Sequence, residues 1–255
     1  MTDAVRWMGI GRTDIGHVRR SNQDAYAILN DHGVWFLADG MGGHAGGDIA
    51  AQTAVAVAVD YTKDHAAFLQ DQPDTAPSIL IDTVIAVNKA IHDTARLKPY
   101  LKGMGTTFVG LGILPSPTPT AHIVHLGDSR AYRFHNGSLT QLTQDHTLVE
   151  GFLNRGLIDA ETARIHPDRH ILVKALGMGI GLKPELTSSP LHHTDMVLLC
   201  TDGLNKMLDD SAIAAVLARC SGDPDRASYE LIKEALAQGG EDNVTVVVCA
   251  SVSQS

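Results

Sequence analysis

Apolar residues fall into short runs along the chain, and most of these runs come as neighbouring pairs separated by turn-forming residues. Runs of this length are typical of β-strands, and a pair joined by a few turn residues predicts a hairpin. The clearest turn is Asn136-Gly137, because both residues tolerate the positive φ angles of a tight hairpin. The predicted strands are residues 25–29, 34–38, 106–114, 120–126, 130–134, 138–142, 196–201 and 244–251.

Helical patterns lie in separate blocks between these pairs. Asp48 is a candidate cap for a helix over 48–64, and Ser78 for one over 78–96. The second helix is supported by apolar residues at helical spacing, namely Ile81, Val84, Ile85, Val87 and Ile91. Further helices are predicted over 211–220 and over 224–238, before Gly239. Strand pairs and separate helical blocks indicate an α+β fold rather than alternating βαβ units.

Composition and charge exclude several classes of protein. With 255 residues, 44% of them apolar and 19% charged, the chain has enough apolar residues for a substantial core and is not a disordered protein. The net charge of −9 argues against nucleic-acid binding, which needs a broad basic face. No apolar run suggests a membrane span, and residues 1–7 lack the apolar stretch of a secretory signal, so we expect a cytoplasmic protein. In that compartment Cys200, Cys220 and Cys249 are expected to be buried, reduced thiols.

Acidic residues recur where the predicted strands begin or end. Asp39, Asp128 and Asp202 each follow an apolar run beside a glycine, whereas Asp242 precedes one and Asp24 opens one. A single Asp-Gly pair is most simply a turn. Five acids at the ends of packed strands would repel one another strongly unless they bound protons or cations. Oxygen ligands suit Mg²⁺ or Mn²⁺, and two such ions can share a water, lower its pKa and direct it at a phosphoryl group.

A nucleotide-binding interpretation competes for the same region. Residues 40–45 fit the pattern G-x-G-x-x-A, and Asp60 lies twenty residues after Gly40 at the end of the alternating run 54–59. If that run were a strand, only residues 48–53 would remain for a parallel crossover, which needs a dozen or more. Asp39 would also place negative charge beside a pyrophosphate. A metal-dependent nuclease would use similar acids, but the chain lacks a basic tract.

Seven stretches of the chain match one family in order. They are TDIGHVRRSNQD (13–24), ADGMGGHAGG (38–47), GTT (105–107), GDSR (127–130), DH (145–146), CTDG (200–203) and GEDNVTV (240–246). Together they show that the sequence resembles the metal-dependent Ser/Thr protein phosphatases of the PP2C type (the PPM family), in their bacterial form. The resemblance implies a four-layer αββα fold, a β-sandwich of two antiparallel sheets flanked by helix pairs. It also implies one PP2C-like domain over 1–255, with a small helical flap insert at about 143–179.

The resemblance assigns roles to individual residues. The two core ions would be held, partly through water, by Asp24, Asp39, the Gly40 carbonyl, Asp202 and Asp242. Asp128 matches the ligand of a weaker third ion, and Arg19 matches the arginine that binds the substrate phosphate.

Three further residues are expected beside this centre. Gln23 stands where the family usually has glutamate and would hold a metal-bound water without adding charge, and Asn243 would lie next to the ligands. His44 is a candidate proton donor, with a structural role in its loop as the alternative.

The implied activity is hydrolysis of phosphoserine and phosphothreonine by a hydroxide that bridges two Mn²⁺ or Mg²⁺ ions. Expected partners are phosphorylated proteins, including a bacterial Ser/Thr kinase that the phosphatase would oppose, with no nucleic acid and no membrane; we expect a monomer. The alternative function is a catalytically weak, phosphatase-like module that binds phosphoproteins. Loss of metal-site acids would mark such a module, and here every expected aspartate is present.

Overall fold

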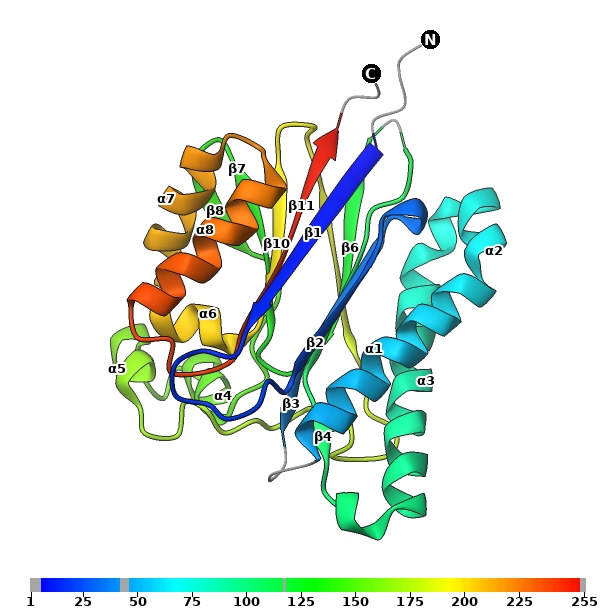
Figure 1. The fold of residues 1–255 in the computed structure, drawn as a ribbon, viewed down its shortest axis with the longest axis vertical. Helices are drawn as coiled ribbons and strands as arrows, with labels where there is room; N and C mark the ends of the chain where they lie inside the picture. Colours follow the sequence, from blue (N-terminus) through cyan, green and yellow to red (C-terminus); the bar gives the residue numbers. More distant parts are fainter. Residues whose placement is uncertain (1–5, 42–45, 117, 253–255) are drawn as a thin grey trace.

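Two antiparallel β-sheets pack face to face in the computed structural model, which describes residues 6–41, 46–116 and 118–252 (Figure 1). The first sheet has the strand order β1-β11-β10-β7-β8, and the second has the order β2-β3-β5-β6-β9 with β4 paired to β3. The first contains β1 (Arg6–Asp14), β7 (Arg130–His135), β8 (Ser138–Gln141), β10 (Met196–Cys200) and β11 (Val244–Val252). The second contains β2 (Asp24–Leu29), β3 (Val34–Met41), β4 (Gly105–Thr106), β5 (Phe108–Gly112), β6 (Thr120–Leu126) and β9 (Glu185–Pro190).

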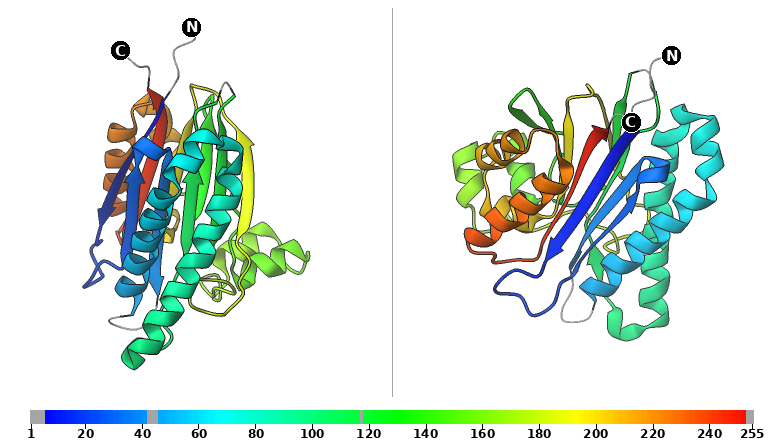
Figure 2. Two further views of the ribbon diagram at one scale, coloured as in Figure 1. Left: turned by 90° about the vertical axis from the view of Figure 1, so that its right-hand side faces the viewer. Right: turned by 45° about the horizontal axis from the view of Figure 1, so that its top comes forward.

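Helices cover the outer face of each sheet. The second sheet carries α1 (Gly47–Asp64), α2 (Ala66–Asp71) and α3 (Ala76–Leu97). The first carries α6 (Asp202–Met207), α7 (Asp210–Cys220) and α8 (Pro224–Ala237). Two further helices, α4 (Leu148–Asn154) and α5 (Ala160–Ile165), belong to the connection between β8 and β9 and project from the end of the sandwich opposite the two termini (Figure 2). The predicted αββα arrangement is confirmed.

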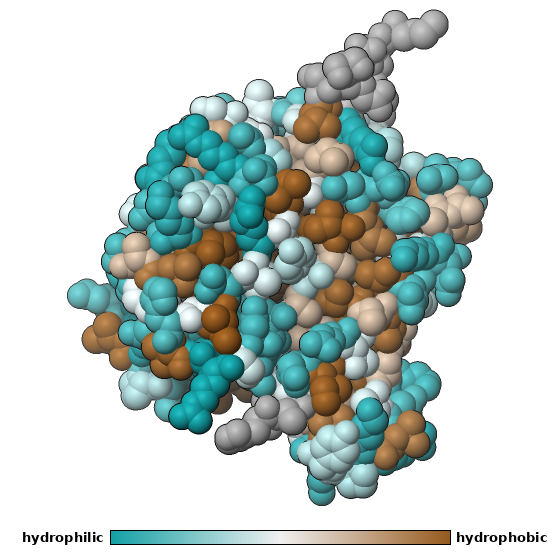
Figure 3. Space-filling view, in the orientation of Figure 1, coloured by the Kyte–Doolittle hydropathy of each residue, from teal (hydrophilic) through white to brown (hydrophobic). Residues whose placement is uncertain are grey.

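The core has three layers, and the alternation of side chains along the strands explains them. In β3, Trp35 and Leu37 point between the two sheets, whereas Phe36 and Ala38 pack against the helices of the second sheet. Successive strand residues face opposite sides, so a strand covered on both faces must be apolar throughout. Figure 3 shows apolar atoms at the surface between β1 and α1, the side where β2 and its partly buried residues lie.

All eight predicted strands are present, but two further strands were not predicted. β1 reads RWMGIGRTD, and its glycines and arginines obscure the alternation. The glycines make room for aromatic rings of the second sheet, since a Cβ would lie 2.2 Å from Trp35 Nε1 at Gly9 and 2.3 Å from the Tyr26 ring at Gly11. β9 buries only Ser189, so its sequence carries no apolar signal. The run 106–114 forms β4 and β5, with Thr107 between them.

The predicted helix caps need correction. α1 begins at Gly47 with Gly46 as its cap, and α3 begins at Ala76, so neither Asp48 nor Ser78 is an N-cap. The Ser78 hydroxyl instead donates to the Thr75 carbonyl. Ile85 of α3 is 53% exposed, although its spacing predicted a core position. The short helices α2 and α6 were not predicted.

Residues 54–59 lie inside helix α1, so the strand required by the nucleotide-binding interpretation does not exist. The three cysteines are buried free thiols, as predicted. Within the described ranges, no helix combines the length and apolar character needed to cross a membrane.

Candidate metal centre

Aspartates from both sheets meet at the end of the sandwich where β2 begins and β3 leads into α1 (Figure 1). Asp24 opens β2 and pairs in register with Asp39 of β3. Asp202 opens α6 directly after β10, and Asp242 precedes β11. Asp128 follows β6. The charges of the other four carboxylates all raise the pKa of Asp39. The five acids predicted from strand ends therefore form one cluster.

Asp24 links the two sheets. Its Oδ2 atom accepts hydrogen bonds from the hydroxyls of Thr201 at 3.0 Å and Thr245 at 2.6 Å, both from the end of the first sheet. Its other oxygen, Oδ1, is buried and has no hydrogen-bond partner among the described residues. A buried carboxylate oxygen without a partner is costly, so this atom is suited to a ligand. The two threonines were not singled out from the sequence, because threonine in a strand is ordinary.

Burial and mutual repulsion make the cluster unfavourable when it is fully charged. Burial, followed by the charges of Asp24, Asp202, Asp128 and Asp242, raises the pKa of Asp39 well above its usual range. Burial also raises the pKa of Asp24 to about 7, and the threonine hydrogen bonds only partly offset this. The pKa of Asp128 is raised to about 7, by burial first and then by Asp202. Without a cation, these carboxylates tend to hold protons near neutral pH.

Glycines beside two of the acids permit a close approach of backbone segments. A Cβ on Gly40 would lie 2.0 Å from the carbonyl oxygen of Gly47, and a Cβ on Gly203 would lie 2.0 Å from that of Asn243. Gly203 thus lets the start of α6 lie against the loop that carries Asp242. The Asp-Gly pairs are therefore more than turns, since they bring the acids of different elements together.

Two basic side chains contact Asp242. Arg19 Nε lies 2.7 Å from Oδ1, and Arg19 Nη2 donates to Oδ2 at 2.8 Å. Lys206 Nζ lies 2.7 Å from the same Oδ2 and 2.6 Å from Oδ2 of Asp202. Burial works against the charge of Asp242, yet Lys206 and Arg19 hold its pKa below the usual range. Lys206 was not predicted from the sequence; its signal is the four-residue spacing from Asp202, which is informative only once α6 is known.

Asn243 and Gln23 order the loop that carries Arg19. The Asn243 side chain accepts from the Gln23 backbone N–H at 2.9 Å and donates to the carbonyls of Ile15 and Ser21. The Gln23 carbonyl in turn accepts from the Gly40 N–H at 3.0 Å. Both residues therefore border the cluster and fix the backbone around it. His44, the candidate proton donor, lies outside the described residues.

The loop with Asp128 is fixed by its neighbours. The Gly127 N–H donates to His146 Nδ1 at 3.0 Å, and the Gly127 carbonyl accepts from the His146 N–H at 2.9 Å. Gly127 has a φ of +110°, and a Cβ there would lie 2.6 Å from Thr107. The matching GDSR and DH stretches thus form one unit that sets the position of Asp128.

His146 also belongs to a second group of metal-ligand residues, with His125 and Glu185, whose ligand atoms lie within 4.8 Å of one another. Hydrogen bonds already occupy His146 and Glu185, whereas His125 pairs through Nε2 with the Gln144 carbonyl and its Nδ1 has no partner among the described residues. Because His146 Nδ1 accepts from Gly127, its proton lies on Nε2, which is 2.7 Å from Glu185; Lys174 also binds Glu185, at 2.8 Å. A metal bound to Nε2 would require the proton to lie on Nδ1. Two N–H donors, those of His146 and Gly127, would then face each other without an acceptor. His146 and Glu185 are therefore held in a hydrogen-bond network with Gly127 and Lys174.

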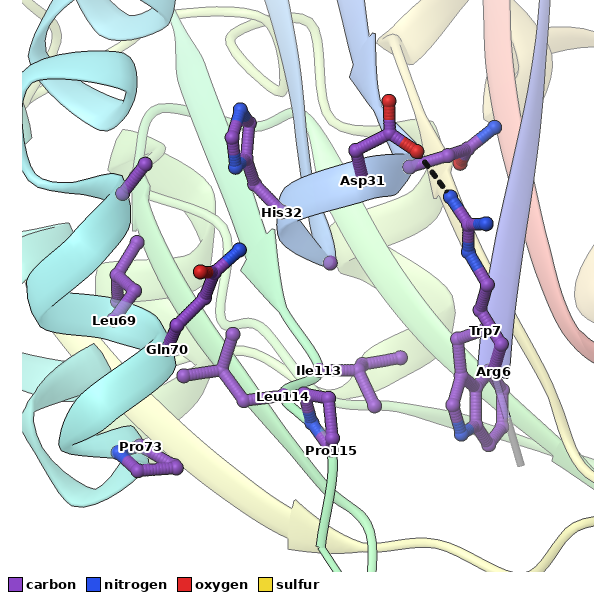
Figure 4. A pocket seen from close by; sticks show the side chains of 13 residues that line it. Arg6, Trp7, Asp31, His32, Leu69, Gln70, Pro73, Ile113, Leu114 and Pro115 are labelled. Carbon is purple, nitrogen blue, oxygen red and sulfur yellow. Dashed lines mark hydrogen bonds and ion pairs between the residues drawn. The ribbon is translucent and has the colours of Figure 1, made fainter. Parts of the chain in front are cut away.

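A cavity of about 310 Å³ lies at the other end of β2 and β3, around the turn of η1 (Asn30–His32) (Figure 4). Its lining is largely apolar and includes Trp7, Leu69, Leu114 and Pro115, together with the Arg6–Asp31 ion pair. None of the clustered aspartates lines it. Among the described residues, the metal-type chemistry is therefore found at the aspartate cluster and not in this cavity.

The donor set fits hard divalent cations. The cluster offers carboxylate oxygens, one of them buried without a partner among the described residues, and a lysine ammonium already lies between two of the carboxylates. Oxygen-only sites of this kind suit Mg²⁺ and Mn²⁺. Such ions would relieve the repulsion that raises the pKa values of Asp24, Asp39 and Asp128.

Comparisons with known proteins agree with one another. The profile of a family described as protein phosphatase 2C matches residues 15–237. The serine/threonine phosphatase stp of Listeria welshimeri is 36% identical over 243 residues, covering 93% of both chains. The crystal structure of the Mycobacterium tuberculosis serine/threonine phosphatase PstP/Ppp matches with a TM-score of 0.85 and 34% identity, covering 96% of this chain and 98% of that one. A structure of the PstP catalytic domain in complex with two manganese ions matches with a TM-score of 0.81 and 35% identity, covering 97% and 99% of the two chains.

The cluster predicts how pH affects the metal-free protein. In the folded state Asp24 and Asp128 have pKa values of about 7, against an ordinary value of 3.8. Between these values the folded state binds more protons than the unfolded state, so these groups lower stability as pH rises from about 4 to 7. In a chelator, the melting temperature of the Asp24→Asn variant should fall less than that of the wild type from pH 5 to pH 8. Parallel curves for the two proteins would contradict the raised pKa of Asp24.

Proposed function

Since the chain belongs to the protein phosphatase 2C family and is a metal-dependent serine/threonine protein phosphatase, we propose that its clustered aspartates form the metal centre of that reaction. The ligands of two core ions would be Asp24, Asp39, the Gly40 carbonyl, Asp202 and Asp242. The observation that carries this assignment is the convergence of these acids from both sheets, with the unpartnered Asp24 Oδ1 among them. The two-manganese structure of a relative supports the number of ions.

The protein's own residues hold the metal ligands in position and balance the charge of the site. When bound, Mn²⁺ or Mg²⁺ supplies the Lewis-acid chemistry, lowering the pKa of a shared water and offsetting the charge of the phosphate. Thr201 and Thr245 hold Asp24 in a fixed orientation, and Gly203 lets Asp202 approach Asp242. Fixed ligands of this kind need no rearrangement during the reaction.

We assign Arg19 to the phosphate of the substrate. It is half-exposed, and Asp242 engages its Nε and one terminal nitrogen. A guanidinium has five N–H donors in a planar fork, so donors remain for phosphate oxygens while Asp242 orients the group. Asp242 would thus serve both the metal centre and the arginine.

Asp128 is proposed as the ligand of a third, weaker ion. Burial is the largest cause of the raised pKa of Asp128, and the charge of Asp202 is the next. Gln23, which replaces the usual glutamate, adds no charge to the core site. The sequence therefore favours modest metal affinity.

Residues 143–179 are proposed to form a flap beside the centre. His170 lies close enough to Lys206, Asp202 and Asp242 for their charges to act on it. The segment is anchored to the sandwich where Leu176 bridges to Thr106, and within it the Val173 N–H donates to the His146 carbonyl. It exposes large apolar side chains at Leu157, Ile165, Ile171, Val173 and Met178. An exposed apolar surface beside a phosphate site suits a protein substrate.

The partners that follow are phosphorylated proteins, and we propose a Ser/Thr kinase of the same cell as the opposing enzyme. We also propose a cytoplasmic location, because a reducing compartment suits the three buried free thiols. A binding module without catalysis is disfavoured by the full set of acids.

Asp39→Asn should remove nearly all turnover of a phosphothreonine peptide, because one core carboxylate is lost. The same change should raise the melting temperature of the metal-free protein, since burial and repulsion disfavour the charged form of Asp39. Peptide assays with Mn²⁺ and melting curves in chelator measure the two effects. Asp60→Asn, at an exposed position of α1, is the control. Full activity of Asp39→Asn, or activity of the wild type in chelator, would refute the metal centre.

Arg19→Ala should lower kcat/KM by about 10 to 150-fold, the range for a lost charged hydrogen bond of roughly 1.5 to 3 kcal/mol. Manganese stoichiometry, measured after equilibrium dialysis, should stay at the wild-type value. A loss of bound manganese would instead mean that Arg19 acts through Asp242.

Arg169→Ala and His166→Ala should slow hydrolysis of a phosphoprotein several-fold while leaving hydrolysis of p-nitrophenyl phosphate nearly unchanged, because only a large substrate reaches the flap. Arg219→Ala, an exposed arginine of α7, should affect neither substrate. Equal losses on both substrates would indicate damage to the metal centre, and no loss on either would reduce the segment to scaffolding.

A further inference from the structure

Lys206 is placed between two carboxylates of the cluster. Its Nζ lies 2.6 Å from Asp202 Oδ2 and 2.7 Å from Asp242 Oδ2, so one ammonium joins an acid of α6 to an acid of the loop before β11. Asp202 is on the same helix, four residues earlier, and the two side chains share one face. Asp242 comes from a different element, which makes this contact tertiary.

The same ammonium reaches the outer part of the cluster. Its charge acts on Asp128, which also faces Asp202 and Asp145. A cation attached to Asp202 therefore acts on Asp128, the residue proposed above as the ligand of a third divalent ion. The charge of Lys206 also acts on His170 of the segment 143–179.

We propose that Lys206 acts as a resident cation of the carboxylate cluster: it holds Asp202 and Asp242 together before metal ions bind, and it weakens binding of the outermost divalent ion. This inference rests on the proposed metal centre and concerns the balance of electrical charge within it.

Formal charges give the reason. With all five aspartates ionised, as they would be with metal bound, Asp24, Asp39, Asp128, Asp202 and Asp242 set against Lys206 and Arg19 leave three negative charges. Two divalent ions more than neutralise these, so a third ion would approach a centre with no remaining net attraction. Without Lys206 the centre with two ions would be neutral. A unit charge a few ångströms from a divalent ion repels it strongly at an intermediate dielectric, although rearrangement and solvent reduce this effect.

A lysine ammonium, unlike a divalent ion, is present in the metal-free protein as well. It relieves repulsion between Asp202 and Asp242 without requiring any ion in solution, and burial around it is offset by the two carboxylates that keep the lysine charged. Among the described residues, removal of its charge would leave Arg19, on Asp242, as the one basic side chain in contact with these two acids.

Calorimetric titration of metal-free protein with Mn²⁺, together with melting curves in chelator, tests the proposal with Lys206→Gln and Lys206→Arg. Lys206→Gln should melt several degrees lower without metal and should bind its weakest manganese ion about tenfold more tightly. Lys206→Arg keeps the charge and should stay near the wild type in both measurements. Lys89→Gln is the matched control, because Lys89 and Asp93 form an exposed lysine–aspartate pair with the same i,i+4 spacing and a 2.6 Å contact.

Unchanged or weaker manganese binding by a folded Lys206→Gln variant, or equal behaviour of Lys206→Gln and Lys206→Arg, would overturn the proposal. These outcomes are distinct from a failure of the metal centre itself, in which the wild type would bind no manganese and its peptide hydrolysis would not respond to the metal.

Discussion

Repulsion among the clustered aspartates is the constraint that organises this end of the molecule. Burial and neighbouring charge raise the pKa values of Asp24, Asp39 and Asp128 together, so the cluster is costly whenever it is fully ionised without counter-charges. The fold tolerates it because the strands that carry the acids are anchored by large apolar layers far from the charges. A cation that binds at the cluster removes this repulsion. Binding is therefore favoured by strain that the apolar core holds in place.

Each acid is held by a different kind of support. Asp24 is fixed by threonine hydroxyls from the opposite sheet, Asp242 by two cations, and the Asp128 loop by the backbone contacts between Gly127 and His146. The supports differ because the neighbours differ: Asp24 lies where the threonines of the opposite sheet reach it, whereas Asp242 lies beside the half-exposed Arg19 and beside Lys206. This division leaves Asp24 Oδ1 free of partners among the described residues and keeps Asp242 charged.

Features with a local pattern could be predicted from the sequence. Apolar runs located most strands of both sheets, and the acids at their ends located the cluster. Residues that act through tertiary contacts could not be predicted. Thr245 looks like any strand threonine, and the role of Lys206 depends on its contact with Asp242, which lies 36 positions away along the chain. β1 and β9 were missed for a related reason, since their pairing depends on what the partner strands present. The match to known motifs assigned Arg19 to phosphate, but only the fold reveals that Asp242 orients it.

The place of β11 in the first sheet bears on how the protein is made. β11 lies between β1 and β10, and it pairs with β1 from Arg6 against Val252 to Asp14 against Val244. During synthesis β1 therefore has no neighbour in its sheet until β11, which begins at Val244, has left the ribosome. Thr245, which orients Asp24, arrives at the same late moment. Long-range pairing of this kind is slow to form, and a nascent chain that has already released Asp24, Asp39, Asp128 and Asp202 cannot yet arrange them as an active site. Assembly of the centre is thus tied to the synthesis of β11, so a nascent phosphatase that lacks this strand cannot act on phosphoproteins around the ribosome.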